Sequence, residues 1–443
     1  MNVTDEKKMT KIPDLTIWGG TALTLNSKNE VILNAQIDVL HGRIIAIQSI
    51  DKPTVHCAKK VIDARNCIVL PGLINGHTHT GMTLLRGIAD DMPLHSWLNE
   101  KIFPLEKKWG SKEFVYVGTL LAQIEMIRSG TTLFNDMYYF EASAARAIHE
   151  GGLRGICGQT LVEISGVEDT GKIFSQFDEY LSEIESYSRV IPAIAPHSIY
   201  GVSDSIWEQV SNYAFQKKLR VHLHLQETAA ELEDCLKKRK ITPTAFFEKI
   251  GLWKNRAIAA HVVCVTAEDI EILSRNQVGV VHNPESNLKL GTGIAPIVKL
   301  RKAGIKVSLG TDGAASNNNL DLLQEADTAL KLQILQNGVG ALTAEDIVKI
   351  LTIEGATALK LDHEVGSLEV GKSADLIAIS TEEAHATPIY NPFSHLAYSA
   401  SGSDVKHSVV GGSVIMENRK ILTLDESSIL EEARAWGRRI AQT

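Results

Sequence analysis

The chain lacks the features that are typical of membrane, secreted and nucleic-acid-binding proteins. No apolar run among its 443 residues reaches the roughly 18 residues that a membrane helix needs. The N-terminal MNVTDEKKMTKIPDL has no apolar core of the kind found in signal peptides. Lys and Arg number 45 against 53 Asp and Glu, so the net charge is −8. With no basic block, we expect neither nucleic acid nor a membrane surface as a partner.

Cysteine is scarce and scattered along the chain. No two cysteines have the spacing of a zinc motif or a redox motif. We therefore interpret them as reduced thiols of a cytoplasmic protein. The five are Cys57, Cys67, Cys157, Cys235 and Cys264.

The two ends of the chain resemble each other in composition. Residues 14–70 and 366–424 are short runs rich in Ile, Val, Leu and Thr, broken by Gly, Asn and Asp, which is typical of β-strands and turns. We therefore expect residues 1–69 and 366–443 to build one small β-sandwich domain together. The overall usage of 44% hydrophobic and 22% charged residues is that of a globular protein and excludes disordered, collagen-like and coiled-coil chains.

A helix is predicted at the C-terminal end of the second β segment. Ser428 and Glu431 have the spacing of a capping box. The residues that follow place an apolar stripe on one helical face, which predicts a helix docked on the rest of the protein. That stripe consists of Ile429, Ala433, Trp436 and Ile440.

The middle of the chain alternates between short apolar runs and amphipathic stretches of helical period. Eight such runs occur, among them TTLFND, LRVHLHLQE and KVSLGTD. Strands that alternate with helices indicate parallel βαβ units, and eight units predict an α/β fold with a (β/α)8 TIM-like barrel over residues 70–365. The alternative is an open doubly wound sheet. It would carry a glycine-rich phosphate turn after its first strand, and no GxGxxG follows any of these runs.

The sharpest chemical signal is a histidine pair at the end of the first barrel strand. Residues i and i+2 of a strand face the same side, so His77 and His79 point at one spot. A bare HxH is common by chance and could be two polar residues at the rim. The pair alone therefore does not establish a metal site.

Further ligand-type side chains stand at other predicted strand ends. The fifth strand presents His224, with Glu227 three residues on, the sixth ends in His261 and the eighth ends before Asp312. The C-terminal strand ends of a barrel meet at one mouth, so these groups should converge with His77 and His79. Imidazoles together with a carboxylate suit one divalent metal, Zn²⁺ first and Fe²⁺ as an alternative.

The order of these motifs resembles the amidohydrolase superfamily. PGLINGHTH after a β segment, HLHLQE, the sixth-strand histidine and GTDGAASNN all match, over nearly the whole chain. The resemblance implies that His77, His79, His224 and Asp312 are the metal ligands. It also implies that His261 assists beside the attacking water. The fourth strand, VIPAIAPHS, has no lysine of the kind that two-metal members modify, which favours a single metal.

Within that superfamily the chain is similar to the 5-methylthioadenosine/S-adenosylhomocysteine deaminases. The matching segments include HTHTGMTLLRGIADDMPLHSWLNEKIFPLEKKW, APHSIYGVS and HNPESNLKLGTGIAPI. The resemblance implies that Glu106 binds the ribose hydroxyls, His197 contacts the nucleoside and Glu227 shuttles protons. Some members carry an arginine after the third strand, where this chain has Gln159. That difference favours methylthioadenosine over the longer, charged S-adenosylhomocysteine.

These residues suit a hydrolytic deaminase that turns the 6-amino group of a purine nucleoside into a 6-oxo group and releases ammonia. Metal-activated water would attack C6 while Glu227 protonates N1. Asp312 can act as a base as well as a ligand, and His261 can stabilise the developing charge. The candidate substrates are 5'-methylthioadenosine, S-adenosylhomocysteine and adenosine, and the resemblance implies a homo-oligomer.

Two other functions remain open from the sequence. The first is a deaminase or dechlorinase of another heteroaromatic ring, such as guanine, 8-oxoguanine or a triazine. A free base offers nothing for Glu106 to bind, so that residue discriminates between the two enzymes. The second is a non-catalytic protein that keeps the barrel, since a fold does not fix a function. The roles of Trp97, Gln159 and His282 stay unassigned.

Overall fold

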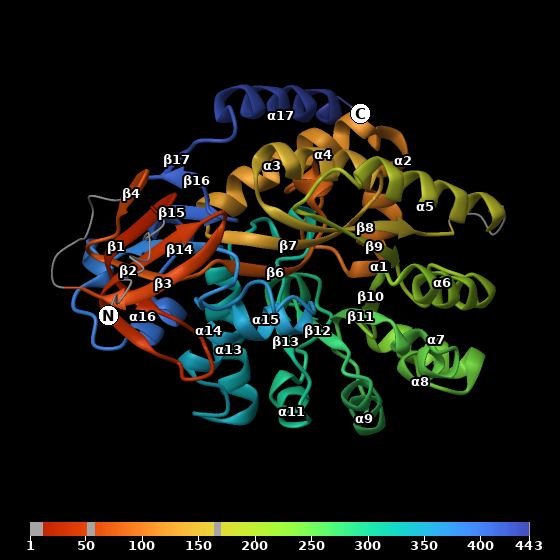
Figure 1. Ribbon diagram of the computed structural model, residues 1–443. Coiled ribbons are helices and arrows are strands. Elements are labelled where there is room, and N and C mark those ends of the chain that lie inside the picture. The colour runs from red at the N-terminus through yellow and green to blue at the C-terminus, as the bar shows by residue number, and fades with distance from the viewer. Residues whose placement is uncertain (1–11, 51–57, 164–169, 443) are drawn as a thin grey trace, which may run out of the picture.

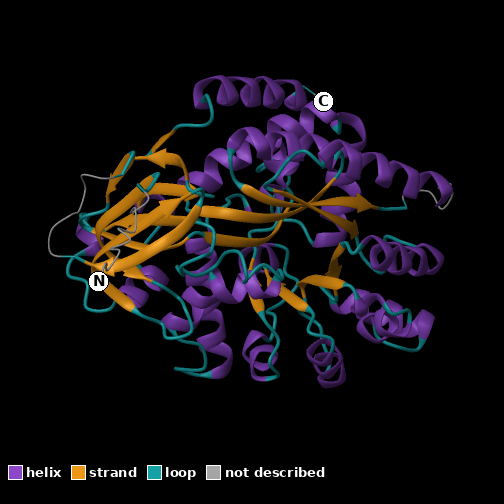
Figure 2. Cartoon of the chain, viewed as in Figure 1, coloured by secondary structure: helices purple, strands orange, loops and turns teal. Residues whose placement is uncertain are grey.

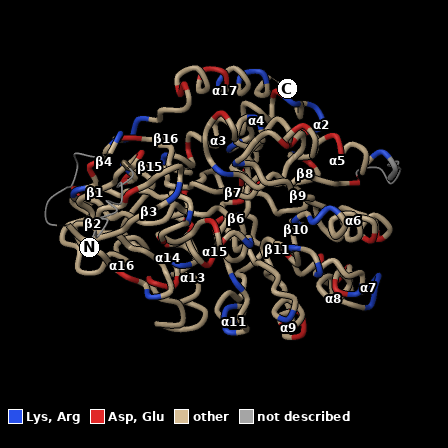
Figure 3. Tube along the Cα trace, in the orientation of Figure 1, with Lys and Arg blue, Asp and Glu red and all other residues tan. Residues whose placement is uncertain are grey.

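The structure is a computed structural model that describes residues 12–50, 58–163 and 170–442. It consists of a barrel ringed by helices, with a second sheet beside it (Figures 1 and 2). The predicted fold class is thereby confirmed. Acidic and basic residues are interspersed on the outer helices in the view of Figure 3. Within the described residues, none of the helices is both long enough and apolar enough to cross a membrane.

Eight parallel strands close the barrel, in the order β10-β11-β12-β13-β6-β7-β8-β9. Six of them contribute to an apolar cluster inside the barrel, and the opposite faces of the strands pack against the helices. The strands are β6 (Leu73–Thr78), β7 (Thr131–Tyr138), β8 (Arg154–Leu161), β9 (Val190–Pro196), β10 (Arg220–Leu225), β11 (Arg256–His261), β12 (Gly279–His282) and β13 (Val307–Leu309).

Helices connect successive barrel strands and cover the barrel from outside. Several begin at a threonine whose side chain accepts a backbone N–H of the first turn, including Thr228, Thr266 and Thr343. The outer helices are α3 (Lys112–Arg128), α4 (Glu141–Gly151), α5 (Thr170–Ile184), α6 (Asp204–Lys217), α7 (Ala229–Arg239), α8 (Pro243–Lys249), α9 (Ala267–Arg275), α11 (Ile297–Lys302), α13 (Leu322–Asn337), α14 (Ala344–Leu351) and α15 (Ile353–Ala358), with the short turn η4 (Leu252–Lys254).

Short helical segments follow the C-terminal ends of three strands and build the mouth of the barrel. After β6 the chain forms η2 (Thr80–Leu85), α1 (Leu94–Ser96), η3 (Trp97–Ile102) and α2 (Phe103–Trp109). After β12 it forms α10 (Pro284–Lys289), and after β13 it forms α12 (Ala314–Asn317). These segments carry several of the side chains that line the site described below.

The small domain is one mixed sheet of nine strands, built from both ends of the chain as predicted. Its order is β17-β16-β15-β14-β5-β1-β2-β3, with β4 paired to β1, and it encloses an apolar core of its own. Its strands are β1 (Leu15–Leu23), β2 (Val31–Leu40), β3 (Arg43–Ser49), β4 (Lys60–Asp63), β5 (Cys67–Pro71), β14 (Leu376–Ser380), β15 (Val405–Val410), β16 (Ser413–Glu417) and β17 (Lys420–Ile421). Beside it lie η5 (Ala384–Ala386), α16 (Pro392–Tyr398) and η6 (Gly402–Asp404).

The apolar run that the sequence predicts as the first barrel strand is divided between the two domains. β5 pairs in the small sheet and β6 in the barrel, with Gly72 between them. A Cβ atom at Gly72 would lie 2.0 Å from Oγ1 of Thr132, so only glycine allows this close approach. The predicted domain limit at residue 70 falls inside β5, and the exact limits stay a prediction.

The C-terminal helix α17 (Glu426–Ala441) docks on the barrel helices through the predicted apolar face. Ile429, Trp436 and Ile440 are buried, and the Trp436 ring packs edge-on against Phe114. The predicted capping box is wrong, because the helix begins earlier and its N-cap is Asp425. The Asp425 side chain accepts the backbone N–H of Ser428, which makes Ser428 a first-turn residue.

Candidate metal centre and pocket

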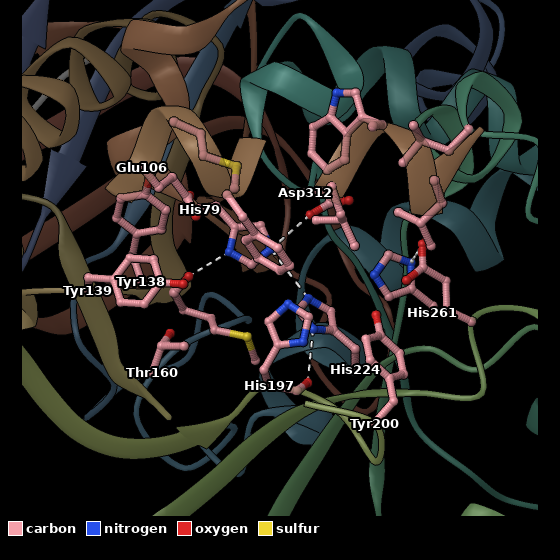
Figure 4. A pocket seen from close by; sticks show the side chains of 18 residues that line it. His79, Glu106, Tyr138, Tyr139, Thr160, His197, Tyr200, His224, His261 and Asp312 are labelled. Atoms are coloured by element: carbon pink, nitrogen blue, oxygen red, sulfur yellow. Dashed lines mark hydrogen bonds and ion pairs between the residues drawn. The ribbon is translucent and has the colours of Figure 1, made fainter. Parts of the chain in front are cut away.

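The predicted site residues converge on one cavity at the C-terminal ends of the barrel strands (Figure 4). This follows from strand alternation, as β10 shows. Val221, Leu223 and Leu225 pack with the outer core, so His222 and His224 face inward. The cavity is lined by His79, Glu106, His197, His224, Glu227, His261 and Asp312, while His77 lies fully buried beneath it.

Four ligand atoms from three strand ends meet at one point. Nε2 of His224 lies 3.2 Å from Nε2 of His77 and 3.3 Å from Nε2 of His79. Oδ1 of Asp312 completes the group, at 3.2 Å from Nε2 of His77 and 3.1 Å from Nε2 of His79. Three imidazoles and one carboxylate oxygen thus surround a common centre.

The other ring nitrogens of the three histidines hold the rings in place. Nδ1–H of His79 donates to the carbonyl of Met137, and Nδ1–H of His224 donates to the carbonyl of His197 at 2.9 Å. Nδ1 of His77 lies 3.0 Å from Nε2 of the buried His222. Such partners fix the ring orientation of metal-binding histidines. His222 therefore supports His77 from within the barrel.

This arrangement fits a bound cation. With their Nδ1 atoms donating, the rings of His79 and His224 present Nε2 as an acceptor when both rings are neutral. Two acceptors at 3.3 Å repel each other unless a positive centre lies between them. Nitrogen ligands with one carboxylate are a donor set that zinc accepts. The chemistry of the residues present is therefore that of a site for one divalent metal.

Asp312 and His261 are held in unusual backbone conformations. Both are non-glycine residues in the left-handed region, with φ of 59° and 70°. Such conformations cost about 1–3 kcal/mol each and persist where the surroundings determine them. Oδ2 of Asp312 accepts hydrogen bonds from the hydroxyls of Ser286, at 2.6 Å, and Ser316, at 3.0 Å. Nδ1–H of His261 donates to Oδ1 of Asn287 at 2.8 Å.

Glu227 lies beside His261 at the edge of the ligand group. Its Oε1 is 3.7 Å from Nδ1 of His261. Burial raises the pKa of the Glu227 carboxyl above its ordinary value, and the nearby His261 offsets part of the rise. The Glu231 carboxylate accepts the backbone N–H groups of Gln226 and Glu227, at 2.9 and 3.0 Å, and so fixes the turn that presents Glu227. The raised pKa favours the protonated form of this carboxyl.

Glu106 lies on the other side of the pocket from His261 (Figure 4). It is on α2 and only 8% exposed, and its Oε1 has no hydrogen-bond partner among the described residues. Burial raises the pKa of Glu106 to about 7, an effect that the neighbouring Tyr138 hydroxyl and His79 partly offset. A buried acceptor without a partner is costly, so Glu106 is suited to accept a hydrogen bond from a ligand.

His197 follows β9 and packs its ring against the ring of His224, with centroids 4.5 Å apart. Its Nδ1 lies 3.0 Å from the Ser198 hydroxyl. Burial lowers the pKa of His197 to about 3, so the ring is neutral and can exchange a hydrogen bond with a polar ligand.

Gln159 does not face the pocket. Its Oε1 accepts the backbone N–H of Glu141 at 3.0 Å, at the start of α4. The next residue, Thr160, lines the cavity instead, because neighbouring side chains on a strand point to opposite faces. The same alternation could have identified Thr160 from the sequence once the register of β8 was known.

The remaining wall is apolar and aromatic, and most of it was not predicted. Trp97, which the sequence left unassigned, lines the pocket, whereas the buried His282 is not among the lining residues. The other lining residues are Met82, Leu94, Leu98, Phe103, Met137, Tyr138, Tyr139, Tyr200 and Leu290. Their apolar character is indistinguishable in the sequence from that of core residues, so no local signal marks them.

Comparisons with known proteins agree with this geometry. The amidohydrolase family profile matches residues 68–415. A 5-methylthioadenosine/S-adenosylhomocysteine deaminase of Syntrophobacter fumaroxidans is 40% identical over 96% of this chain and 98% of its own length. A 5'-deoxyadenosine deaminase of Methanobrevibacter smithii is 40% identical over 95% of this chain and 97% of its own. The crystal structure of an adenosine deaminase from Xanthomonas campestris with bound zinc superposes with a TM-score of 0.92 at 34% identity, covering 97% and 99% of the two chains.

Proposed function

The chain belongs to the amidohydrolase family and is a hydrolase acting on C–N bonds, and from that premise we propose that it deaminates 5'-methylthioadenosine. The reaction replaces the 6-amino group of the purine by a 6-oxo group and releases ammonia. The observation that carries the proposal is the buried Glu106 carboxyl across the pocket from His261, whose Oε1 has no hydrogen-bond partner among the described residues. It provides a place for ribose hydroxyls, which a free base does not have.

We assign one divalent metal, Zn²⁺ in the first place and Fe²⁺ as the alternative, to His77, His79, His224 and Asp312. The convergence of their donor atoms supports this assignment, as does the zinc in the related adenosine deaminase structure. When bound, such a metal supplies a hydroxide nucleophile by lowering the pKa of water towards about 7.

The protein's own side chains divide the proton transfers between them. Glu227, whose burial favours the protonated form, gives a proton to N1 of the purine as C6 is attacked. Asp312 accepts one proton of the attacking water and passes it to the departing amine, and the hydroxyl proton left on C6 goes to Glu227 as the 6-oxo group forms, which restores its acid form. In its doubly protonated form His261 keeps Nδ1–H on Asn287 and donates a hydrogen bond through Nε2 to the oxygen that is added at C6, which stabilises the developing charge.

The pocket walls favour a neutral 5' substituent. Glu106 accepts hydrogen bonds from the ribose hydroxyls, and the neutral His197 exchanges one with the nucleoside. No lysine or arginine is found among the described residues that line the cavity, whereas Glu106, Glu227 and Asp312 are acidic. The carboxylate of S-adenosylhomocysteine would meet no cation there, so we place methylthioadenosine ahead of it.

A deamination assay tests the proposal. Zinc-loaded protein is mixed separately with methylthioadenosine, 5'-deoxyadenosine, S-adenosylhomocysteine, adenosine, guanine and 8-oxoguanine, and ammonia release is followed together with the ultraviolet spectrum of the purine. We expect the highest kcat/KM for methylthioadenosine or 5'-deoxyadenosine. Turnover of guanine or 8-oxoguanine with none of any nucleoside would overturn the proposal.

Substituting Glu106 tests the ribose contact separately. Glu106→Gln keeps the shape of the side chain but removes its charge, so the ribose hydroxyls lose a charge-assisted hydrogen bond of about 1.5–3 kcal/mol. We expect kcat/KM for methylthioadenosine to fall by roughly 10- to 100-fold. Steady-state kinetics provide the measurement, and the exposed Glu100 one turn before α2 gives the control Glu100→Gln. Unchanged kinetics in Glu106→Gln would refute the ribose role.

We also propose that the protein works in the cytoplasm and as a homo-oligomer. The cysteines at positions 67, 157, 235 and 264 are all free thiols, as expected in a reducing compartment. The oligomer is inferred from the family, and light scattering of the purified protein measures it directly.

A further inference from the structure

A buried carboxyl outside the pocket connects the two loops that hold Asp312 and His261. Glu325 lies in the first turn of α13, on the outside of the barrel (Figure 1). Its side chain is fully buried, and no lysine or arginine of the described chain forms an ion pair with it. Its two oxygens instead accept hydrogen bonds from two different loops.

One oxygen of Glu325 is linked to the loop after β13. The Asn317 side-chain amide donates to Oε1 of Glu325 and also donates to the carbonyl of Thr311 at 2.9 Å. Thr311 directly precedes Asp312, the residue with φ of 59°. The bond from Glu325 thus orients the Asn317 amide that supports the backbone of a proposed metal ligand.

The other oxygen of Glu325 is linked to the loop after β12. Oε2 accepts the backbone N–H of Glu285 at 3.2 Å. The next residue, Ser286, donates to Oδ2 of Asp312, and Asn287 accepts from Nδ1–H of His261. α10, which carries these residues, packs against both α12 and α13. These two routes of contacts, through Asn317 and through the backbone of Glu285, are called the two arms of Glu325 below. Both arms lead to Asp312.

We propose that Glu325 is a positioning residue that sets the orientation of Asp312 and His261 through Asn317 and the backbone of Glu285. Asp312 follows β13 and His261 ends β11, 51 residues earlier in the sequence, and both have left-handed backbones that their surroundings must hold. The only hydrogen bonds that the described structure gives the Glu325 carboxyl are those to the two loops. The inference rests on the proposed metal site but not on the identity of the substrate.

The test compares Glu325→Gln with the wild-type protein. Glutamine preserves the shape of the side chain, but its amide group faces one of the two donors and breaks one arm. We expect the affinity for zinc, measured by competition with a chromophoric chelator, to fall by about 10- to 100-fold, as for other residues that support metal ligands. We also expect kcat for methylthioadenosine to fall by a similar factor while KM changes less than about threefold, because Glu325 touches no substrate.

Two further variants make the result decisive. Asn317→Ala breaks the first arm by another route and should show the same effects, which keeps the test valid if Glu325→Gln does not fold. Gln333→Leu is the control, since Gln333 is buried on the same helix but donates to Ala295. Wild-type zinc affinity in both arm variants, with or without a lower melting temperature, would overturn the proposal. If the wild-type protein deaminates no nucleoside, the chelator measurement still decides this inference.

Discussion

Replacing Glu227 by glutamine is expected to lower kcat for methylthioadenosine by at least ~100-fold while zinc stays bound, because general acid–base catalysis contributes about 100- to 10,000-fold. Glutamine fits the same space but cannot give a proton to N1. Oε1 of Glu227 lies 3.7 Å from Nδ1 of His261, and Glu227 contributes none of the four donor atoms that converge at the metal site. The metal should therefore stay bound in the variant. Steady-state kinetics and metal analysis of the same sample measure both quantities.

Glu233→Gln is the matched control for this experiment. Glu233 lies on α7, six residues after Glu227 in the sequence, and its side chain is exposed. Its substitution should leave kcat and metal content unchanged. Near-normal turnover by Glu227→Gln would assign the proton transfer to another residue, and loss of zinc from that variant would make Glu227 a ligand instead.

Replacing a side chain that is proposed to bind the metal is expected to abolish both activity and metal retention. In His224→Ala the metal loses one of four donors, and we expect kcat to fall by more than ~100-fold, since even supporting residues of metal sites contribute 10- to 100-fold. The bound metal should drop well below one per chain. Asp312→Asn should behave in the same direction, because the amide is a poorer ligand and a poorer base than the carboxylate.

Chelation provides the comparison for the ligand variants. Wild-type protein treated with a chelator should lose activity and regain it when zinc is added, whereas His224→Ala should stay inactive at the same zinc concentration. His149→Ala removes an exposed histidine on α4 and should retain metal and activity. Full activity in chelator-treated wild-type protein would rule out a metal-dependent reaction.

The sequence was sufficient to predict the barrel because the signal for each strand and helix is local. Eight apolar runs between amphipathic stretches correspond to β6 to β13, and the two β-rich ends pair in one sheet. Two details differ from the prediction, and each has a physical cause. The division of β5 from β6 depends on contact between Gly72 and Thr132, and the start of α17 depends on which of several polar side chains caps the helix.

The convergence of the site could likewise be predicted, since parallel barrel strands bring their C-terminal ends together. His77, His79 and His224 approach as the spacing indicated, and Asp312 completes the set. The motifs also identified the amidohydrolase family, which the comparisons confirm. The roles proposed for Glu106, His197, Glu227 and His261 remain predictions, now with defined positions.

The sequence by itself determined which residues lie at the strand ends and which side of a strand they face, because these properties depend on a period of two over a few neighbouring residues. Only the tertiary structure decided which distant groups meet. His222 contacts His77 across 145 positions, the Asn75 amide donates to Thr311 across 236, and Glu325 joins two separate loops. Such contacts depend on how helices and loops pack around the closed barrel, and no short segment of the chain encodes that packing.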